Sequence, residues 1–306
     1  MSNSTLLILK NASFEVGVCP KNGGVITHFT SPHRGEKIDW FRAINIAELN
    51  NPIDALNAAS FPLFPFSNRI ANNMLSIGGE DYKLSSNVEG WPQIIHGHSW
   101  LGKWHVTHHS DTVITLTFKF PNTSVECCGW PYSYEAEQKF ELSDTGLNIQ
   151  LKLLNTSDKV MPAGMGIHPY FCTEPNMQVS LNTTGQWFGD ELNIPHTHES
   201  ETVAVLSFRE GELTKELDHN FTGWDGVANI HWPSHGGTLQ IKASDLFRNA
   251  VVYSPKEESY FCLEPVTHTT NAFNQSDLSD VLGGTQMLAP SESIQGDIQF
   301  TPQNFE

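Results

Sequence analysis

Two short segments of the sequence place an ionisable side chain directly before a proline, and the two side chains have complementary chemistry. His168 lies in AGMGIHPYF at 163–171, and Glu264 lies in CLEP at 262–265. Histidine has an unperturbed pKa of about 6.5, so an imidazole can give and take a proton near neutral pH. A carboxylate can accept one, so the two groups together would form an acid–base pair.

The residues around His168 predict a strand with one bare face. Proline biases the residue before it towards an extended conformation, so we expect His168 to lie in a strand, with its proline at an edge or bulge. Alternation then places Gly164, Gly166 and His168 on one face, and Met165 and Ile167 on the core face. Glycine weakens a strand, so we expect the space beside His168 to receive a ligand.

Glu264 belongs to a second alternating strand. Phe261 and Leu263 face one side, and Tyr260, Cys262 and Glu264 face the other. Burying a carboxyl group on an apolar strand is costly unless the group is paired or solvated. The alternative interpretation is that Glu264 ends a strand at the protein surface.

Two further clusters combine polar and aromatic residues. FPLFPFSNRI at 61–70 ends with Asn68 and Arg69, and WPQIIHGHSW at 91–100 contains His96 between two tryptophans. Arginine is a rigid fork of hydrogen-bond donors, and the face of an indole suits the apolar face of a sugar ring. Either cluster alone would be weak evidence, because tryptophans usually lie in the core.

Five histidines lie close together in the sequence and could suggest a metal site, but their spacing does not match that of known metal ligands. The set has no H-E-x-x-H or similar ligand spacing, and GHSWLG is not the G-x-S-x-G of a serine nucleophile. We therefore predict no metal and no cofactor. The histidines in question are His96, His98, His105, His108 and His109.

Composition narrows the class of partner. The chain has 306 residues, with 34 acidic and 17 basic side chains and a formal net charge of −17. This charge disfavours nucleic acid and anionic membranes as partners. No signal peptide or membrane span is evident, and the five cysteines include no C-x-x-C pair, so we expect a cytoplasmic protein with reduced thiols.

Period-two alternation dominates the chain and predicts antiparallel strands. The clearest case is a long hairpin, in which 132–142 and 147–153 flank the turn residues SDTG; shorter strands are expected at 13–18, 24–29, 114–120, 238–243, 250–255 and 259–265. Helical periodicity is short or interrupted, at 46–59 and 276–284. We predict an all-β fold, a large antiparallel β-sandwich in which residues 1–306 form a single domain.

Five motifs occur in an order that resembles the aldose 1-epimerase family, which includes the galactose mutarotases. The resemblance implies the family's large antiparallel supersandwich fold and a free sugar, an aldohexose, as substrate. The HP of GIHPYF differs from the NHSYFN of typical galactose mutarotases, which leaves the preferred sugar open. The motifs are PFSNRI, IHGHSW, MPAGMGIHPYF, LDHNFTGW and LEPVTHTTNAFN.

By this resemblance Glu264 takes the place of the catalytic base and His168 that of the acid. Arg69, His96 and Asp218 match positions that bind sugar hydroxyls, and we count Asn68 with them. Asp225 in GWDG is an alternative to Asp218. The implied activity is mutarotation, in which acid–base ring opening and closure interconverts the α and β anomers.

Several alternatives remain open at this stage. A hexose-6-phosphate 1-epimerase would need cations near the motifs, where Arg69 and Lys103 are the main ones available. A non-catalytic sugar-binding protein would have no need of an acid–base pair. A glycoside hydrolase would use Glu264 and Asp218 as its two carboxyl groups. The chain would act as a monomer or a homodimer.

Overall fold

The computed structural model describes residues 6–44, 55–121, 128–200, 205–209, 212–213, 217–256, 258–275 and 283–304. These ranges contain strands and short 3-10 turns, with no α-helix, so the all-β prediction is confirmed. Most of the two segments with helical periodicity, and Cys127, lie outside the described residues. No described helix has the length and apolar character that crossing a membrane requires. The turns are η2 (Ala55–Asn57), η3 (Ala71–Asn73), η4 (Ser99–Leu101) and η6 (Ala272–Asn274).

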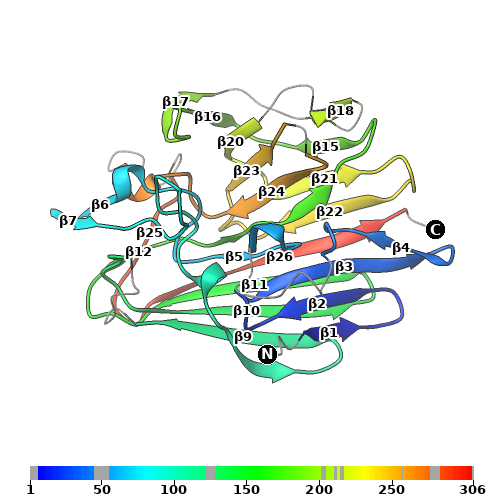
Figure 1. Ribbon diagram of the computed structural model, residues 1–306, viewed down its shortest axis with the longest axis horizontal. Coiled ribbons are helices and arrows are strands. Elements are labelled where there is room, and N and C mark those ends of the chain that lie inside the picture. The colour runs from blue at the N-terminus through cyan, green and yellow to red at the C-terminus, as the bar shows by residue number, and fades with distance from the viewer. Residues whose placement is uncertain are drawn as a thin grey trace.

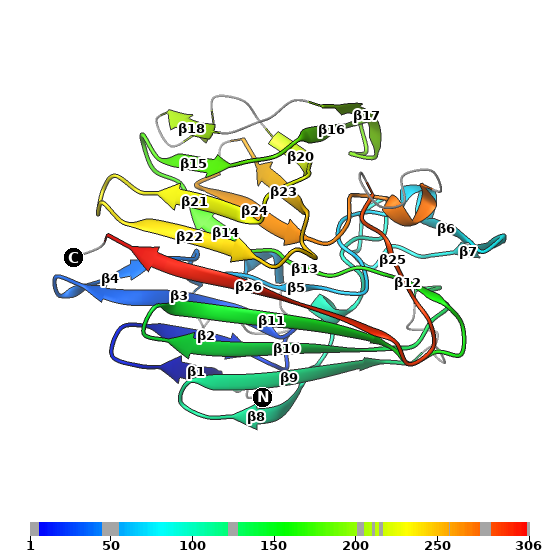
Figure 2. The same cartoon turned by 180° about the vertical axis from the view of Figure 1, so that it is seen from behind.

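One layer of the molecule is a ten-stranded antiparallel sheet, which faces the viewer in Figure 2. The predicted long hairpin lies in it, with Tyr134 opposite Asn155 and Ser143 opposite Gly146. In spatial order the strands are β19 (Glu212–Leu213), β18 (Val205–Arg209), β15 (Gln178–Leu181), β21 (Val227–His231), β22 (Thr238–Ala243), β26 (Ser293–Gln303), β11 (Gly146–Asn155), β10 (Tyr134–Ser143), β9 (Val113–Phe120) and β8 (His105–His109).

The other layer consists of two antiparallel sheets, seen in Figure 1. A bridge between Ile26 and Ser60 joins them. The four-stranded sheet runs β1 (Leu7–Lys10), β2 (Glu15–Cys19), β3 (Val25–His33), β4 (Glu36–Asp39). The eight-stranded sheet runs β17 (Pro195–Glu199), β16 (Gly185–Gly189), β20 (Leu217–Thr222), β23 (Asn249–Ser254), β24 (Tyr260–Val266), β13 (Gly166–Ile167), β5 (Pro62–Leu63), with β14 (Tyr170–Cys172) also on β24.

Two small ribbons complete the described elements: β6 (Met74–Ile77) pairs with β7 (Glu80–Lys83), and β12 (Met161–Ala163) pairs with β25 (Gln286–Leu288). All pairings between the labelled strands are antiparallel, as the alternation predicted. The strands predicted at 13–18, 24–29, 114–120, 238–243, 250–255 and 259–265 correspond to β2, β3, β9, β22, β23 and β24.

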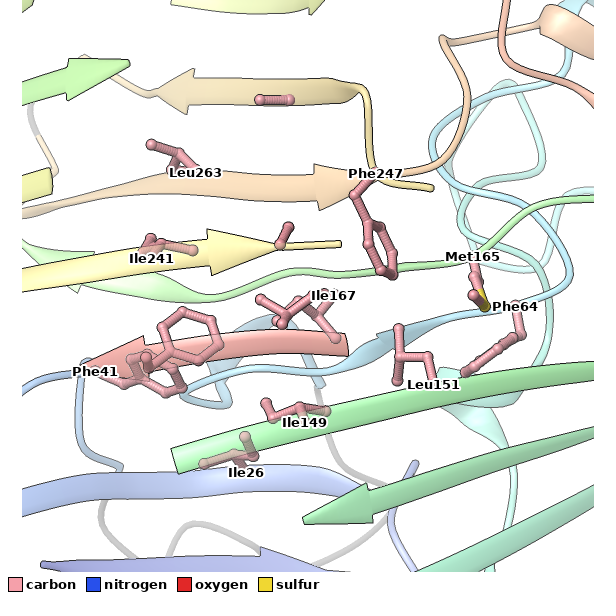
Figure 3. Close-up of a cluster of buried hydrophobic side chains, with 14 of the residues drawn as sticks. Ile26, Phe41, Phe64, Ile149, Leu151, Met165, Ile167, Ile241, Phe247 and Leu263 are labelled. Atoms are coloured by element: carbon pink, nitrogen blue, oxygen red, sulfur yellow. The ribbon is translucent and has the colours of Figure 1, made fainter. Parts of the chain in front are cut away.

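The main core fills the space between the layers. Leu263 of β24 lies in one buried cluster with Ile149 and Leu151 of β11, as Figure 3 shows. The neighbours of Leu263 in the sequence point the other way, and Cys262 and Val266 pack into a second cluster on the opposite face of the sheet. The alternation predicted for this strand is therefore confirmed, and it separates a core face from a second, partly polar face.

The segment around His168 departs from the expected continuous strand. It is interrupted twice, at Gly164–Met165 and at His168–Pro169, so His168 lies in the gap between β13 and β14. The faces follow the prediction nonetheless, because Met165 and Ile167 join the main core. The second break follows from the proline, which has no N–H to donate to a neighbouring strand.

The expectation that Gly164 and Gly166 leave room for a ligand is wrong. A Cβ atom at Gly164 would lie 1.9 Å from Cδ2 of His268, and one at Gly166 would lie 2.8 Å from Cγ1 of Val266. The His268 ring is buried there, and its Nε2 accepts a hydrogen bond of 3.1 Å from the backbone N–H of Ser67. The glycines therefore allow close packing of three chain segments.

Gly164→Ala should destabilise the fold because the new methyl group overlaps the His268 ring. We expect a loss of about 1–3 kcal/mol, typical of overpacking in a core. His268→Ala removes the ring, so Gly164→Ala should cost much less in that background. Urea unfolding of the two single variants and the double variant measures this coupling. Strictly additive losses would contradict the packing described.

Candidate active site

Glu264 lies in the interior of a sheet. Its strand, β24, runs between β23 and β13, and Glu264 pairs with Val251 of β23. The residue is 2% exposed, and the strand continues beyond it to Val266. The alternative that Glu264 ends a strand at the surface is therefore wrong.

His168 meets Glu264 from the break between β13 and β14. The backbone N–H of His168 donates to the carbonyl of Phe61 at 2.9 Å, and the imidazole stacks on the Phe61 ring with 4.5 Å between centroids. This support directs Nε2 of His168 to within 3.2 Å of Oε1 of Glu264. The two groups that were paired on chemical grounds are thus in direct contact.

Burial sets the protonation of this pair. Loss of solvation raises the pKa of Glu264 well above its usual value, and the negative charge of Asp218 raises it further, whereas Arg69 lowers it. Loss of solvation also lowers the pKa of His168 to about 3. The 3.2 Å contact would suit an ion pair, but both shifts favour neutral groups. Between the two groups, these shifts favour placing the shared proton on the carboxyl group of Glu264.

Each member of the pair keeps one polar atom without a hydrogen-bond partner among the described residues. These atoms are Oε2 of Glu264 and Nδ1 of His168, and both are buried. Buried polar atoms in native proteins nearly always have partners, so an unpaired one points to a ligand or to water. The pair thus has unused hydrogen-bonding capacity in a buried site.

Asn68, Arg69 and His96 form a hydrogen-bonded cluster next to His168. Asn68 and His96 adopt left-handed backbone conformations, with φ of 57° and 59°. The N–H of Asn68 donates to Nδ1 of His96 at 3.0 Å, and the N–H of His96 donates to the carbonyl of Asn68 at 2.9 Å. Because Nδ1 accepts, the ring proton of neutral His96 lies on Nε2, which can donate to a ligand. The His96 and His168 rings are perpendicular at 5.3 Å.

Asp218 lies beside Arg69, with 3.8 Å between Oδ2 and Nη1. It is opposite Tyr253 of β23, which in turn pairs with Cys262 of β24, so all three side chains share the face of Glu264. Asp225 is placed differently: its carboxylate accepts from Nδ2 of Asn182 and from the N–H of its near neighbour in a turn. Of the two candidates, Asp218 is the one in the cluster.

The cluster grades from buried to exposed. Glu264 and His168 are closed off from solvent, whereas the side chains of Asp218 and Arg69 are 25% and 20% exposed. Asp218 and Arg69 form the polar rim of the site. A molecule that approaches from solvent would meet this rim first and the acid–base pair last. This arrangement suits a small polar ligand with several hydroxyl groups.

Sequence reasoning missed two side chains at the site. The guanidinium carbon of Arg42 lies 3.9 Å from the centre of the Tyr170 ring, whose centroid is 4.8 Å from that of His168. The positive charge of Arg42 lowers the pKa of His168, although less than burial does. Arg42 is isolated in the sequence and gave no signal. Tyr253, half-buried beside Asp218, could have been found only from the pairing of β20 with β23.

The other candidate histidines and Trp100 have different surroundings. His98 is buried and stacks on Phe120 at 4.2 Å, and neither ring nitrogen has a hydrogen-bond partner among the described residues. Trp100 stacks behind Phe61 at 5.3 Å, so it supports the site from the interior.

The described side chains include no three His, Cys, Asp or Glu residues converging on one point. His105, His108 and His109 are exposed on the edge strand β8.

Comparison with known proteins yields one family. The family model for aldose 1-epimerases matches residues 5–301. The uncharacterized protein YphB of Escherichia coli K12 is 28% identical over 248 residues, which cover 78% of this chain and 82% of YphB.

Solved structures agree with this match. A candidate aldose 1-epimerase from Escherichia coli K12 has a TM-score of 0.82 at 25% identity and covers 98% of this chain and 99% of its own. The GalM/aldose epimerase homologue from C. elegans has a TM-score of 0.80 at 16% identity, with 99% and 100% covered, and so supports the fold alone.

His98→Phe should reduce the acid sensitivity of the fold. Burial lowers the pKa of His98 to about 3, so between its ordinary value of 6.5 and 3 the unfolded chain binds one more proton. Stability from His98 is therefore complete above pH 6.5 and falls by about 1.4 kcal/mol per pH unit as the pH drops below it. Urea unfolding from about pH 7 to about pH 4 measures the slope. Equal slopes in the variant and the parent would show that His98 is not buried as a neutral group.

Proposed function

The chain belongs to the aldose 1-epimerase family, and from that premise we propose that it is a mutarotase that interconverts the α and β anomers of a free aldohexose. The observation that carries the proposal is the buried contact of 3.2 Å between Nε2 of His168 and Oε1 of Glu264. An acid and a base in contact can exchange a proton with two oxygens on the same carbon atom, which is what an anomeric centre presents.

In the proposed reaction the direct contact between the two groups opens, so that the O1 hydroxyl of the sugar meets Glu264 and the ring oxygen O5 meets His168. The carboxylate of Glu264 removes the proton of the O1 hydroxyl, and the imidazolium of His168 protonates the ring oxygen O5. The O1 electrons form the carbonyl as the C1–O5 bond breaks. Rotation about C1–C2 and the reverse proton transfers then close the ring on the other face. Glu264 and His168 together hold the same number of protons before and after the reaction. Proton transfer alone therefore completes the cycle, and the proposed chemistry needs no cofactor.

The surroundings of the pair favour this cycle. The form of the pair that reacts is carboxylate and imidazolium, which differs from the neutral resting form by one proton transfer across the 3.2 Å contact. Arg69 favours ionised Glu264, because its charge lowers the pKa of that carboxyl group. Arg42 lowers the pKa of His168 and so makes its imidazolium a stronger acid towards O5. We propose that Asn68, Arg69, His96 and Asp218 bind the sugar hydroxyls.

We also propose that residues 1–306 act as one domain. The main core cluster contains Val16 of the four-stranded sheet, Leu263 of the eight-stranded sheet and Leu151 of the ten-stranded sheet. Removal of any one sheet would expose part of this common core, so the three sheets would fold together.

Glu264→Gln should strongly reduce catalysis and leave the fold intact, because glutamine keeps the shape of the side chain but cannot act as a base. We expect kcat for mutarotation to fall by about 10² to 10⁴, the usual contribution of a positioned acid or base. The decay of optical rotation of fresh α-D-glucose and α-D-galactose measures it. Glu258→Gln is the matched control, because Glu258 is exposed just before the same strand. Full activity in Glu264→Gln would refute the assigned role.

Free aldoses should be preferred over hexose 6-phosphates. The two arginines near the pair are already engaged: Nη1 of Arg69 donates to Asn68, and Nη2 of Arg42 donates to the carbonyls of Leu56 and Ala58. The negative charge of Asp218 would also repel a phosphate. We expect kcat/KM to be at least about tenfold higher for free glucose or galactose than for the 6-phosphates. The reverse order in the same polarimetric assay would establish a hexose-6-phosphate 1-epimerase.

The same assay separates the proposal from the non-enzymatic and hydrolytic alternatives. Sugar binding in a calorimeter without any acceleration of mutarotation would identify a binding protein on this fold. Release of an aryl group from an aryl glycoside would instead identify a hydrolase. A mutarotase should accelerate the decay and release no aryl group.

A further inference from the structure

A five-residue turn between β16 and β17 holds Asn193 in a fixed position. Oδ1 of Asp190 accepts from the N–H groups of Leu192 and Ile194, at 2.8 and 3.0 Å. The N–H of Asn193 donates to the carbonyl of Asp190 at 2.9 Å, and Asn193 has a φ of 58°, which asparagine tolerates well. At Gly189 a Cβ would lie 2.8 Å from Cα of Asn193, so the chain folds back closely there. The turn is thus built to place the Asn193 side chain.

The Asn193 side chain contacts Asp218. Its Nδ2 donates to Oδ2 of Asp218 at 2.7 Å, and Nη1 of Arg69 lies 3.8 Å from the same oxygen. A carboxylate only accepts hydrogen bonds, so the amide must turn its nitrogen to Asp218 and its oxygen away. Among the described residues no group donates to Oδ1 of Asp218 or to Oδ1 of Asn193. Two neighbouring side chains therefore each keep a free acceptor oxygen on the partly exposed rim.

The location of these acceptors identifies the part of a sugar they would meet. Asp218 is on β20, which is separated from the strand of Glu264 by β23 alone. Two strand spacings are about 9–10 Å, so side chains that extend from both strands can bracket one pyranose ring. With C1 at Glu264, the rim would meet hydroxyl groups other than O1. Each hydroxyl is a donor that a free acceptor oxygen can satisfy.

We propose that Asn193 is a specificity-determining residue, whose Oδ1 and the Oδ1 of Asp218 accept hydrogen bonds from two adjacent sugar hydroxyls. This inference rests on the proposed function, because it assumes that C1 lies at Glu264. Asn193 has a second role as a positioning residue, since its amide fixes Oδ2 of Asp218 and leaves Oδ1 for the substrate. The site would therefore recognise two adjacent hydroxyl groups, a vicinal diol, of a neutral aldose.

The test is a cycle that combines Asn193→Gly with the 2-, 3- and 4-deoxy forms of the preferred aldose. Glycine suits the left-handed backbone of Asn193, so the turn is kept while the amide is lost. In the parent protein, the deoxy sugar that lacks the hydroxyl bound by Asn193 should lose about tenfold in kcat/KM, the value of one hydrogen bond. In Asn193→Gly the same sugar should lose nothing further. Leu192→Ala, in the same turn and exposed, is the matched control.

The readouts separate specificity from a merely structural role. Asn193→Gly should raise KM and leave kcat nearly unchanged, because the amide is remote from C1. Calorimetry on the same sugars gives their dissociation constants for the parent and the variant. The same cycle can then be calculated from binding alone, without turnover. If each deoxy sugar loses the same factor in kcat/KM with the variant as with the parent, this inference is overturned, while the mutarotase proposal stays in place. Failure of the parent protein to accelerate any aldose would instead overturn the proposed function.

Discussion

The cost of burying the Glu264 carboxyl group is the constraint on which the site depends. A lone carboxylate in an apolar interior is strongly disfavoured, and it either finds a partner or takes up a proton. The fold meets this constraint with the contact of 3.2 Å to His168, itself a group whose charged form is disfavoured by burial. The two penalties favour a neutral pair that shares one proton. Such a pair can exchange that proton with a ligand. Burial and the charge of Asp218 oppose ionisation of the carboxyl group, and the charge of Arg69 favours it.

The architecture keeps this pair in place through both faces of one strand. Leu263 of β24 anchors the strand in the main core, and the next residue projects Glu264 to the opposite face. His168 lies in the break between β13 and β14, which both pair with β24, and its backbone N–H donates a hydrogen bond to the carbonyl of Phe61. His268 fills the space at Gly164 and binds the segment that leads to Asn68 and Arg69. The acid, the base and the polar rim are therefore connected through packed backbone.

Alternation along the chain predicted the strands, the long hairpin and the two faces around Glu264 and His168, because those features depend on local periodicity. The interpretation of the glycines was wrong because the ring of His268 comes from a distant segment, and local spacing cannot show what fills a space. The position of Asn193 depends on the turn that places it beside Asp218, which no local motif specifies. The placing of Asp218 rather than Asp225 beside Arg69 likewise needed the structure.

The most direct measurement of the central claim is exchange spectroscopy by NMR on an anomeric mixture of the aldose in D2O. Catalytic amounts of the protein should produce exchange cross-peaks between the α and β H1 signals, with no loss of H1 to deuterium. Ring opening by proton transfer between Glu264, His168 and the sugar oxygens exchanges the anomers but leaves the C1–H bond intact. Cross-peaks no stronger than in buffer, or replacement of H1 by deuterium, would contradict the account.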